Sequence, residues 1–99
     1  MCASSPSTPH FRAYQGQPDP LTALLREPFL LREDNSGTKQ ETLYFLQNHG
    51  LSLDELNVIA VMDDAAALKR CIALGMGISI LSRATVQTDA QQGRLLLFP

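Results

Sequence analysis

The fold is decided by the stretch Asp63–Leu81, which reads DDAAALKRCIALGMGISIL. Two acids at its start are typical of a helix N-terminus, and the alanine-rich segment behind them is amphipathic. Gly75 is expected to end this helix, and the apolar residues after Gly77 then predict a buried strand. The apolar run Leu56–Met62 precedes the stretch, so the unit reads strand, helix, strand. Such a unit favours parallel strands with a right-handed crossover, and ligands normally bind beyond the carboxyl ends of the strands.

Composition limits the size and class of the molecule. With 99 residues, of which 44% are hydrophobic, the chain suffices for one compact domain of modest stability. Its formal net charge of −2 and pI near 5.5 offer no basic surface for a phosphate backbone, so we expect no direct nucleic-acid contact. No apolar run approaches the roughly 20 residues that cross a bilayer, and the N-terminus lacks a secretory signal. We therefore expect a cytoplasmic protein without membrane contact.

The two cysteines, Cys2 and Cys71, stand far apart, with no Cys or His cluster at metal-ligand spacing around them. This pattern predicts neither a disulfide framework nor a metal site, and we expect no cofactor. Cys71 falls on the apolar stripe of its helix, where a thiol behaves as a small hydrophobic group. His49 is expected at a helix end and His10 in a polar arm, both without a visible catalytic partner. The sequence therefore predicts that the chain is not an enzyme.

The first half of the chain contains few regular elements. Residues 1–18 are rich in serine, threonine and proline, which predicts a flexible arm or the remnant of a hinge. Asp19 followed by Pro20 then opens a short helix, which Pro28 prevents from continuing. Phe29–Arg32 is predicted to form a buried strand that leads into a polar turn.

The remaining elements are set by caps and apolar runs. Thr38 and Glu41 match a capping box at the start of a helix that ends at Gly50. The run Asn57–Val61 is β-branched and apolar, as in a strand covered on both faces. Further elements are expected along the rest of the chain: a helix with the apolar stripe Ala65, Leu68, Cys71 and Ile72, a strand Ile78–Leu81, a helix from Ser82 to about Gln91, and a strand Leu95–Phe98.

Two loops are candidates for binding. At Ser36, Gly37 and Thr38, free backbone N–H groups, a helix dipole and two hydroxyls would converge, which suits an anion or a carboxylate. The same residue types also form a simple turn with a helix cap, and spacing alone leaves both interpretations open. Asp63 and Asp64 are open to a similar choice between functional acids and an N-cap, and the pattern favours the cap.

Four segments, taken together in order and spacing, carry a family resemblance. They are Glu27–Glu33, Asn35–Gln40, Asp63–Leu81 and Gln92–Leu95. They resemble the C-terminal half of the effector-binding domain of LysR-type transcriptional regulators. The resemblance implies a three-layer αβα fold with a mostly parallel sheet, as one lobe of a type 2 periplasmic-binding-protein-like fold. Residues 19–99 would then form a single lobe that is incomplete at both ends.

The resemblance also implies a function. The lobe would contribute half of a cleft for a small, anionic effector, with Ser36, Gly37, Thr38, Asp63 and Asp64 as effector-binding residues. The DNA-binding domain of such regulators is absent from this chain, and a homo-oligomer is expected. The alternative is a stand-alone α/β interaction module that homodimerises through an uncovered sheet edge.

Overall fold

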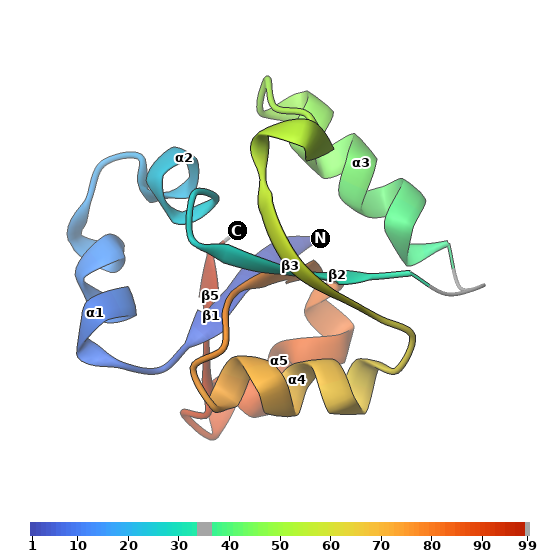
Figure 1. The fold of residues 1–99 in the computed structure, drawn as a ribbon. Coiled ribbons are helices and arrows are strands. Elements are labelled where there is room, and N and C mark those ends of the chain that lie inside the picture. Colours follow the sequence, from blue (N-terminus) through green and yellow to red (C-terminus); the bar gives the residue numbers. More distant parts are fainter. Residues whose placement is uncertain (34–36, 99) are drawn as a thin grey trace.

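The computed structural model of the chain describes residues 1–33 and 37–98 (Figure 1). Its helices are α1 (Pro9–Arg12), α2 (Pro20–Leu24), α3 (Thr38–Asn48), α4 (Ala65–Ala73) and α5 (Arg83–Gln91), with short 3-10 helices η1 (Ala13–Gly16) and η2 (Leu53–Glu55). Its strands are β1 (Cys2–Pro6), β2 (Pro28–Arg32), β3 (Asn57–Met62), β4 (Ser79–Leu81) and β5 (Leu95–Phe98). From β2 onward, strands and helices alternate, as predicted for an α/β fold.

Among the described strands, β1 alone runs opposite to the others. It pairs antiparallel with β4 on one side and with β5 on the other, whereas β2 and β3 pair in parallel. A parallel bridge between Phe29 and Ile78 joins the two groups. In this bridge the Leu30 N–H donates to the Ile78 carbonyl and the Ile78 N–H donates to the Pro28 carbonyl, each at 2.8 Å. The order across the sheet is therefore β5-β1-β4-β2-β3, and the predicted parallel arrangement of β2, β3 and β4 is confirmed.

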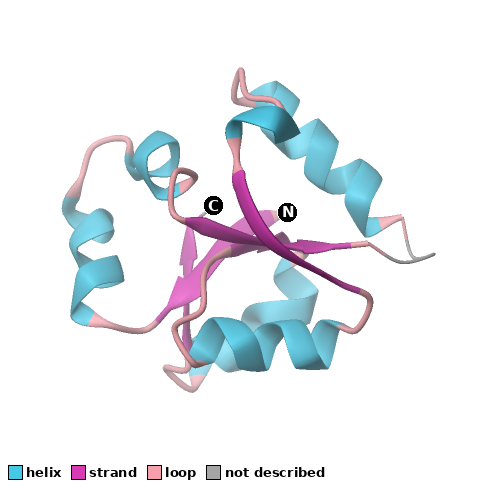
Figure 2. Ribbon diagram, in the orientation of Figure 1, coloured by secondary structure: helices cyan, strands magenta, loops and turns pink. Residues whose placement is uncertain are grey.

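Helices cover both faces of this sheet and make three layers (Figure 2). Two buried clusters lie between the layers. The first contains Phe11, Leu21, Leu24, Phe45 and Leu46 from α1, α2 and α3, and the second contains Leu68, Ile72 and Val86 from α4 and α5. Strand β2 serves both clusters, because Phe29 faces the first and Leu30 the second. The predicted αβα layering is confirmed.

The flexible arm predicted for residues 1–18 is wrong. All five residues of β1 are buried, and the strand lies between β4 and β5 inside the sheet. Helix α1 follows, and its Phe11, only 7% exposed, is part of the first cluster. The strand escaped sequence analysis because its small, partly polar side chains lack the apolar pattern of a buried strand. The other interpretation of this segment, a hinge remnant, stays a prediction.

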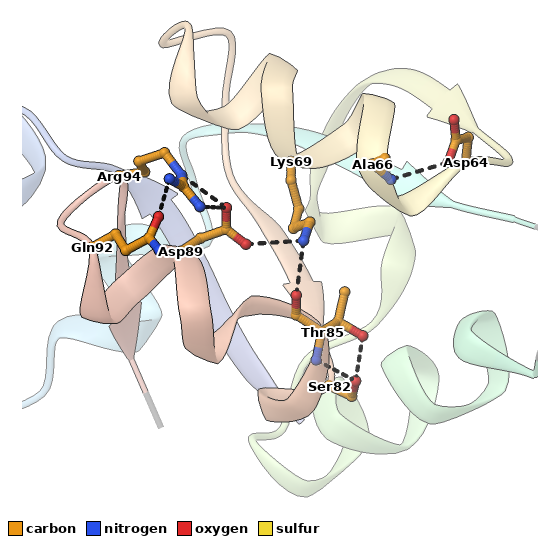
Figure 3. A network of polar contacts seen from close by, with 8 residues as sticks. All are labelled: Asp64, Ala66, Lys69, Ser82, Thr85, Asp89, Gln92 and Arg94. Atoms are coloured by element: carbon orange, nitrogen blue, oxygen red, sulfur yellow. Dashed lines mark hydrogen bonds and ion pairs between the residues drawn. The ribbon is translucent and has the colours of Figure 1, made fainter.

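The helix caps agree with the sequence at α4 and α5 but not at α3. Asp64 accepts the Ala66 N–H at 3.0 Å, and the Ser82 hydroxyl accepts the Thr85 N–H at 3.3 Å (Figure 3). The capping box predicted at Thr38 is wrong. The N-cap of α3 is Gly37, in the left-handed region at φ 82°, and a glycine has no side chain with which to cap the helix. Thr38 is therefore the first helical residue, one position beyond a cap.

The strand predicted at Asn57–Val61 is confirmed as β3, but its expected coverage on both faces is wrong. β3 is an edge strand, and Ile59 and Val61 are 47% and 57% exposed. Helix α3 packs over β2 and β4 rather than over β3. The edge position therefore leaves part of an apolar strand in contact with solvent.

Polar contacts join α4 to α5 (Figure 3). Lys69 Nζ donates to Asp89 Oδ2 at 2.9 Å and to the Thr85 carbonyl at 3.1 Å, and Arg94 Nε donates to Asp89 Oδ1 at 3.1 Å. Arg94 also contacts Gln92. The hydrogen bond from Lys69 lowers the pKa of Asp89, and Arg94 adds to this effect although burial opposes it. Because the folded pKa is depressed, this stabilisation is present at neutral pH and is lost as the pH falls through the folded pKa.

Gly77 lies against the start of β2. A Cβ atom added there would be 2.5 Å from the Pro28 carbonyl oxygen and 3.0 Å from its carbonyl carbon. That oxygen accepts the Ile78 N–H, so it cannot move away without disturbing the bridge between the two groups of strands. The close approach of the two backbones thus requires glycine at this position.

We expect Gly77→Ala to lower the free energy of unfolding by about 1–3 kcal/mol, because the added methyl group overpacks the bridge. Gly16→Ala is the matched control, since nothing lies within 4 Å of the Cβ position at Gly16. Urea denaturation followed by circular dichroism measures both variants. Equal loss of stability in the two would contradict the steric argument.

Candidate functional site

The carboxyl ends of β2, β3 and β4 share one edge of the sheet, because these strands run parallel. At this edge, here called the carboxyl edge, the strands lead into α3, α4 and α5, respectively. β1 begins at the same edge, since Cys2 pairs with Leu81, and β5 ends there, since Phe98 pairs with Ala3. The partially positive N-termini of these helices therefore lie along the carboxyl edge.

The start of α3 carries part of the first predicted site. Gly37 is the N-cap, and its carbonyl accepts the Glu41 N–H at 3.2 Å. The N–H groups of the first turn of a helix have no partner within it, and Gly37 has no side chain with which to cap them. Ser36 lies outside the described residues, and of Thr38 only the backbone is described. The contribution of their two hydroxyls to a binding site stays a prediction.

An ion pair stands beside this helix start. Lys39 Nζ lies 2.9 Å from Glu33 Oε1, and the two side chains are 35% and 48% exposed. Glu33 follows β2, and its N–H donates to the Met62 carbonyl at 2.9 Å, which holds the end of β2 against that of β3. Lys39 thus places a positive charge at the first turn of α3, where an incoming anion would compete with Glu33 for it.

Asp63 and Asp64 follow β3 at the carboxyl edge, and both are exposed. Asp64 is the N-cap of α4, so the structural interpretation of this residue is confirmed. Among the described residues, Asp63 has no hydrogen-bond or ion-pair partner. The parallel register therefore puts Gly37, Thr38 and the two aspartates along one edge of neighbouring strands, as the sequence predicted.

Sequence analysis missed that the start of β1 belongs to this edge. The sequence predicts an arm at Met1 and Cys2, yet Cys2 donates a weak hydrogen bond from Sγ to the Leu81 carbonyl at 3.6 Å. Burial raises the pKa of the Cys2 thiol. The sequence contains only an indirect signal for β1, because a strand of small residues can be recognised only once its neighbours β4 and β5 are known.

The other candidates for chemistry lie apart from one another. The His49 ring is hydrogen-bonded to the Phe45 carbonyl at 2.8 Å near the end of α3, whereas Cys71 lies in α4, on the opposite face of the sheet. No group of three His, Cys, Asp or Glu side chains in residues 1–33 and 37–98 could hold a metal ion.

A polar cluster stands just before β2, at the edge opposite the carboxyl edge. The Tyr14 hydroxyl donates to Glu27 Oε2 at 2.6 Å, and His10 Nε2 lies 2.6 Å from the same oxygen. Partial burial would raise the pKa of Glu27, but the hydrogen bonds from Tyr14 and His10 outweigh it and lower this pKa. The cluster fastens α1 and η1 to the start of β2 and is remote from the carboxyl edge.

Helix N-termini along the carboxyl edge of a mixed sheet, in which four of the five described strands run in the same direction, are typical of small-molecule-binding α/β domains. The chain belongs to the LysR substrate binding domain family, whose model matches residues 2–99. The match includes β1, which the resemblance seen in the sequence did not cover. This family comprises regulatory domains of transcription regulators and is not an enzyme family.

Individual relatives agree with this assignment. The chain is 32% identical, over 92 residues, to the uncharacterized HTH-type transcriptional regulator YeiE of Escherichia coli K12. It is 33% identical, over 70 residues, to the RuBisCO operon transcriptional regulator of Acidithiobacillus ferrooxidans. Among solved structures, it is similar to the regulatory domain of CcmR from Synechocystis PCC6803 in complex with 2-PG, with a TM-score of 0.67 and 25% identity over 98% of this chain. The predicted LysR resemblance and fold class are confirmed.

The chain spans only part of these proteins. It covers 29% of YeiE, 22% of the RuBisCO operon regulator and 44% of the CcmR regulatory domain, while 93%, 71% and 98% of this chain are matched, respectively. Within the part that the structure describes, every helix is too short or too polar to cross a bilayer.

The two aspartates after β3 provide a test of their structural roles. We expect Asp64→Ala to lower the free energy of unfolding by about 1 kcal/mol, because the Ala66 N–H loses its capping partner. Asp63→Ala, at the adjacent exposed position, is expected to leave stability nearly unchanged. Chemical denaturation compares them, and a larger loss in Asp63→Ala would contradict the assignment of the cap.

Proposed function

We propose that this chain is the C-terminal lobe of the effector-binding domain of a LysR-type transcriptional regulator and contributes half of a cleft for a small, anionic molecule. The observation that carries the proposal is the start of α3, whose N-cap Gly37 supplies no capping side chain and which lies at the carboxyl edge beside Lys39. Unpartnered N–H groups at a helix N-terminus favour an anion. The effector-binding residues of this proposal are Ser36, Gly37, Thr38, Asp63 and Asp64.

The directions of β1 and β5 in the sheet support a two-lobe arrangement. β1 enters the sheet and β5 leaves it at the carboxyl edge. A second lobe connected through these strands would therefore face the helix N-termini directly. This chain covers 44% of the CcmR regulatory domain, so the unmatched remainder of that domain is large enough to include a second lobe. The CcmR structure is a complex with 2-PG. In this arrangement the two lobes enclose the effector, and closure is transmitted to a DNA-binding part elsewhere in a cytoplasmic parent protein.

Half a cleft should bind weakly on its own, because only part of the effector's surface is desolvated and contacted. Asp63 and Asp64 accept hydrogen bonds and repel an anionic group, so they are assigned to hydroxyl or other donor groups of the effector. The anionic group itself is assigned to the start of α3. This division follows from the signs of the charges at the two loops.

The proposal is tested with 2-PG, the compound bound to CcmR, and with a panel of small carboxylates and phosphates. In calorimetric titrations of this chain we expect dissociation constants on the order of millimolar for the best ligand. Replacing Ser36 and Thr38 together by alanine should weaken binding about fivefold or more through lost hydrogen bonds to the anion.

Ser52→Ala, at an exposed serine beside η2, is the control and should bind as the unchanged chain does. Micromolar or tighter binding by the chain alone would contradict the half-cleft. Affinity unaffected by the double substitution would remove Ser36 and Thr38 from the site.

A second candidate function, homodimerisation through the sheet edge, is favoured by β3. This edge strand contains no proline and no charged residue, and Ile59 and Val61 are about half exposed. Edge strands of monomeric proteins are usually protected by such residues, so an unprotected one favours a partner. We propose that a second copy of the chain covers β3 and gives the expected homo-oligomer.

We expect the chain to form dimers at high concentration and Val61→Lys to shift it toward monomer, because a charge would have to be buried in the contact. Leu74→Lys is the control, since Leu74 is 80% exposed at the other end of α4 and away from β3. Size-exclusion chromatography with light scattering measures both variants. A monomeric unchanged chain at high concentration would rule out this candidate.

A further inference from the structure

An open cavity of about 260 Å³ lies between α3 and the start of β1, and it has no role in the proposed function. It is lined by Met1, Glu41, Tyr44, Phe45 and Asn48. The four helical residues recur at intervals of three and four, so they belong to one side of α3. This side differs from the helix N-terminus, whose N–H groups point along the helix axis toward the carboxyl edge.

The lining of this cavity has the chemistry of a cation site. Phe45, which is 9% exposed, belongs to the first core cluster, and Met1 packs against that cluster. These two side chains form the apolar base of the cavity. Tyr44 is 68% exposed, an unusual position for a large aromatic side chain. Glu41 provides the single carboxylate of the lining, and Asn48 a neutral amide. An aromatic pair beside one carboxylate attracts organic cations and disfavours anions.

His49 holds Phe45 in place. The His49 ring stacks on it with ring centroids 4.6 Å apart and planes inclined by 35°, and the His49 Nδ1 atom is 2.8 Å from the Phe45 carbonyl. The aromatic base of the cavity is therefore fixed before any ligand arrives. Such preorganisation reduces the cost of binding, since no side chain of the base has to be ordered.

We infer that this cavity binds a small organic ammonium compound, with Glu41 as the counter-charge and the rings of Tyr44 and Phe45 as cation–aromatic partners. The volume is below the usual range for drug-sized ligands, so the ligand is small. The site is independent of the anion proposed at the carboxyl edge. Loss of either one leaves the other intact.

The probe is choline chloride, titrated into isotope-labelled chain at constant ionic strength and followed by amide chemical shifts. The N-terminus is acetylated so that no ammonium group at Met1 competes for Glu41. We expect shifts at the lining residues. The neutral isostere 3,3-dimethyl-1-butanol should bind roughly fivefold more weakly or worse, since it lacks the charge.

Variants separate the charge from the rings. Glu41→Gln and Tyr44→Ala should each weaken choline binding by about threefold or more, whereas Tyr44→Phe retains the ring and should bind normally. Asp54→Asn, at an exposed acid on η2, is the control for a non-specific charge effect. Glu41 and Tyr44 are exposed, so the variants are expected to fold, and the dispersion of the amide spectrum verifies it.

Three outcomes would overturn the inference. These are shifts that are absent or confined to other parts of the chain, equal affinity for choline and its neutral isostere, and affinity that Glu41→Gln leaves unchanged in a folded variant. A loss in Asp54→Asn equal to that in Glu41→Gln would likewise replace a specific site by general attraction to an acidic chain.

Discussion

Two backbone hydrogen bonds of Ile78, each 2.8 Å long, hold the two groups of strands together. Without them, the β2–β3 pair and the β4-β1-β5 group would share no strand pairing. The contact sets β2 beside β4 and parallel to it, and only the absence of a side chain at Gly77 allows the backbones to approach so closely. Because β2 faces both core clusters, the same contact aligns the helix layers on either face. The alignment of β2 and β4 at the carboxyl edge therefore depends on this close contact between the two backbones.

The parts of the fold that sequence predicted well are those governed by local chemistry. The N-cap at Asp64 and the cap at Ser82 involve residues only two or three positions apart, and the structure has both. The helix stop at Gly75, with φ 89°, belongs to the same class. β1 could not be found in this way, because its burial depends on β4 and β5, which are more than 70 residues distant in the chain. The composition of this segment favours a loop, but pairing with β4 and β5 makes it a strand.

The candidate site shows the same division. Parallel strands and the order of the elements were enough to predict that Thr38 and the aspartates at positions 63 and 64 meet at one edge, and the register of β2 and β3 places their loops there. Local detail failed at α3, since a glycine with positive φ took the N-cap position that the threonine pattern suggested. The exposure of Val61 could not be predicted from the sequence either, because an apolar strand at the edge of a sheet can have the same residues as one in the middle. Patterns report what a strand could bury, and the topology decides what it does bury.

The signs of the charges at the carboxyl edge restrict the proposed effector. Glu33 already occupies Lys39 at 2.9 Å, and Asp63 and Asp64 add two further carboxylates nearby along the edge. Like charges in close contact repel each other, by about 1 kcal/mol at 4 Å in water and by more where solvent is excluded. An acidic group of the effector placed next to these carboxylates is therefore disfavoured. A molecule with a single acidic group at the start of α3 and donor groups toward Asp63 avoids this repulsion, and any further positive charge has to come from the facing lobe.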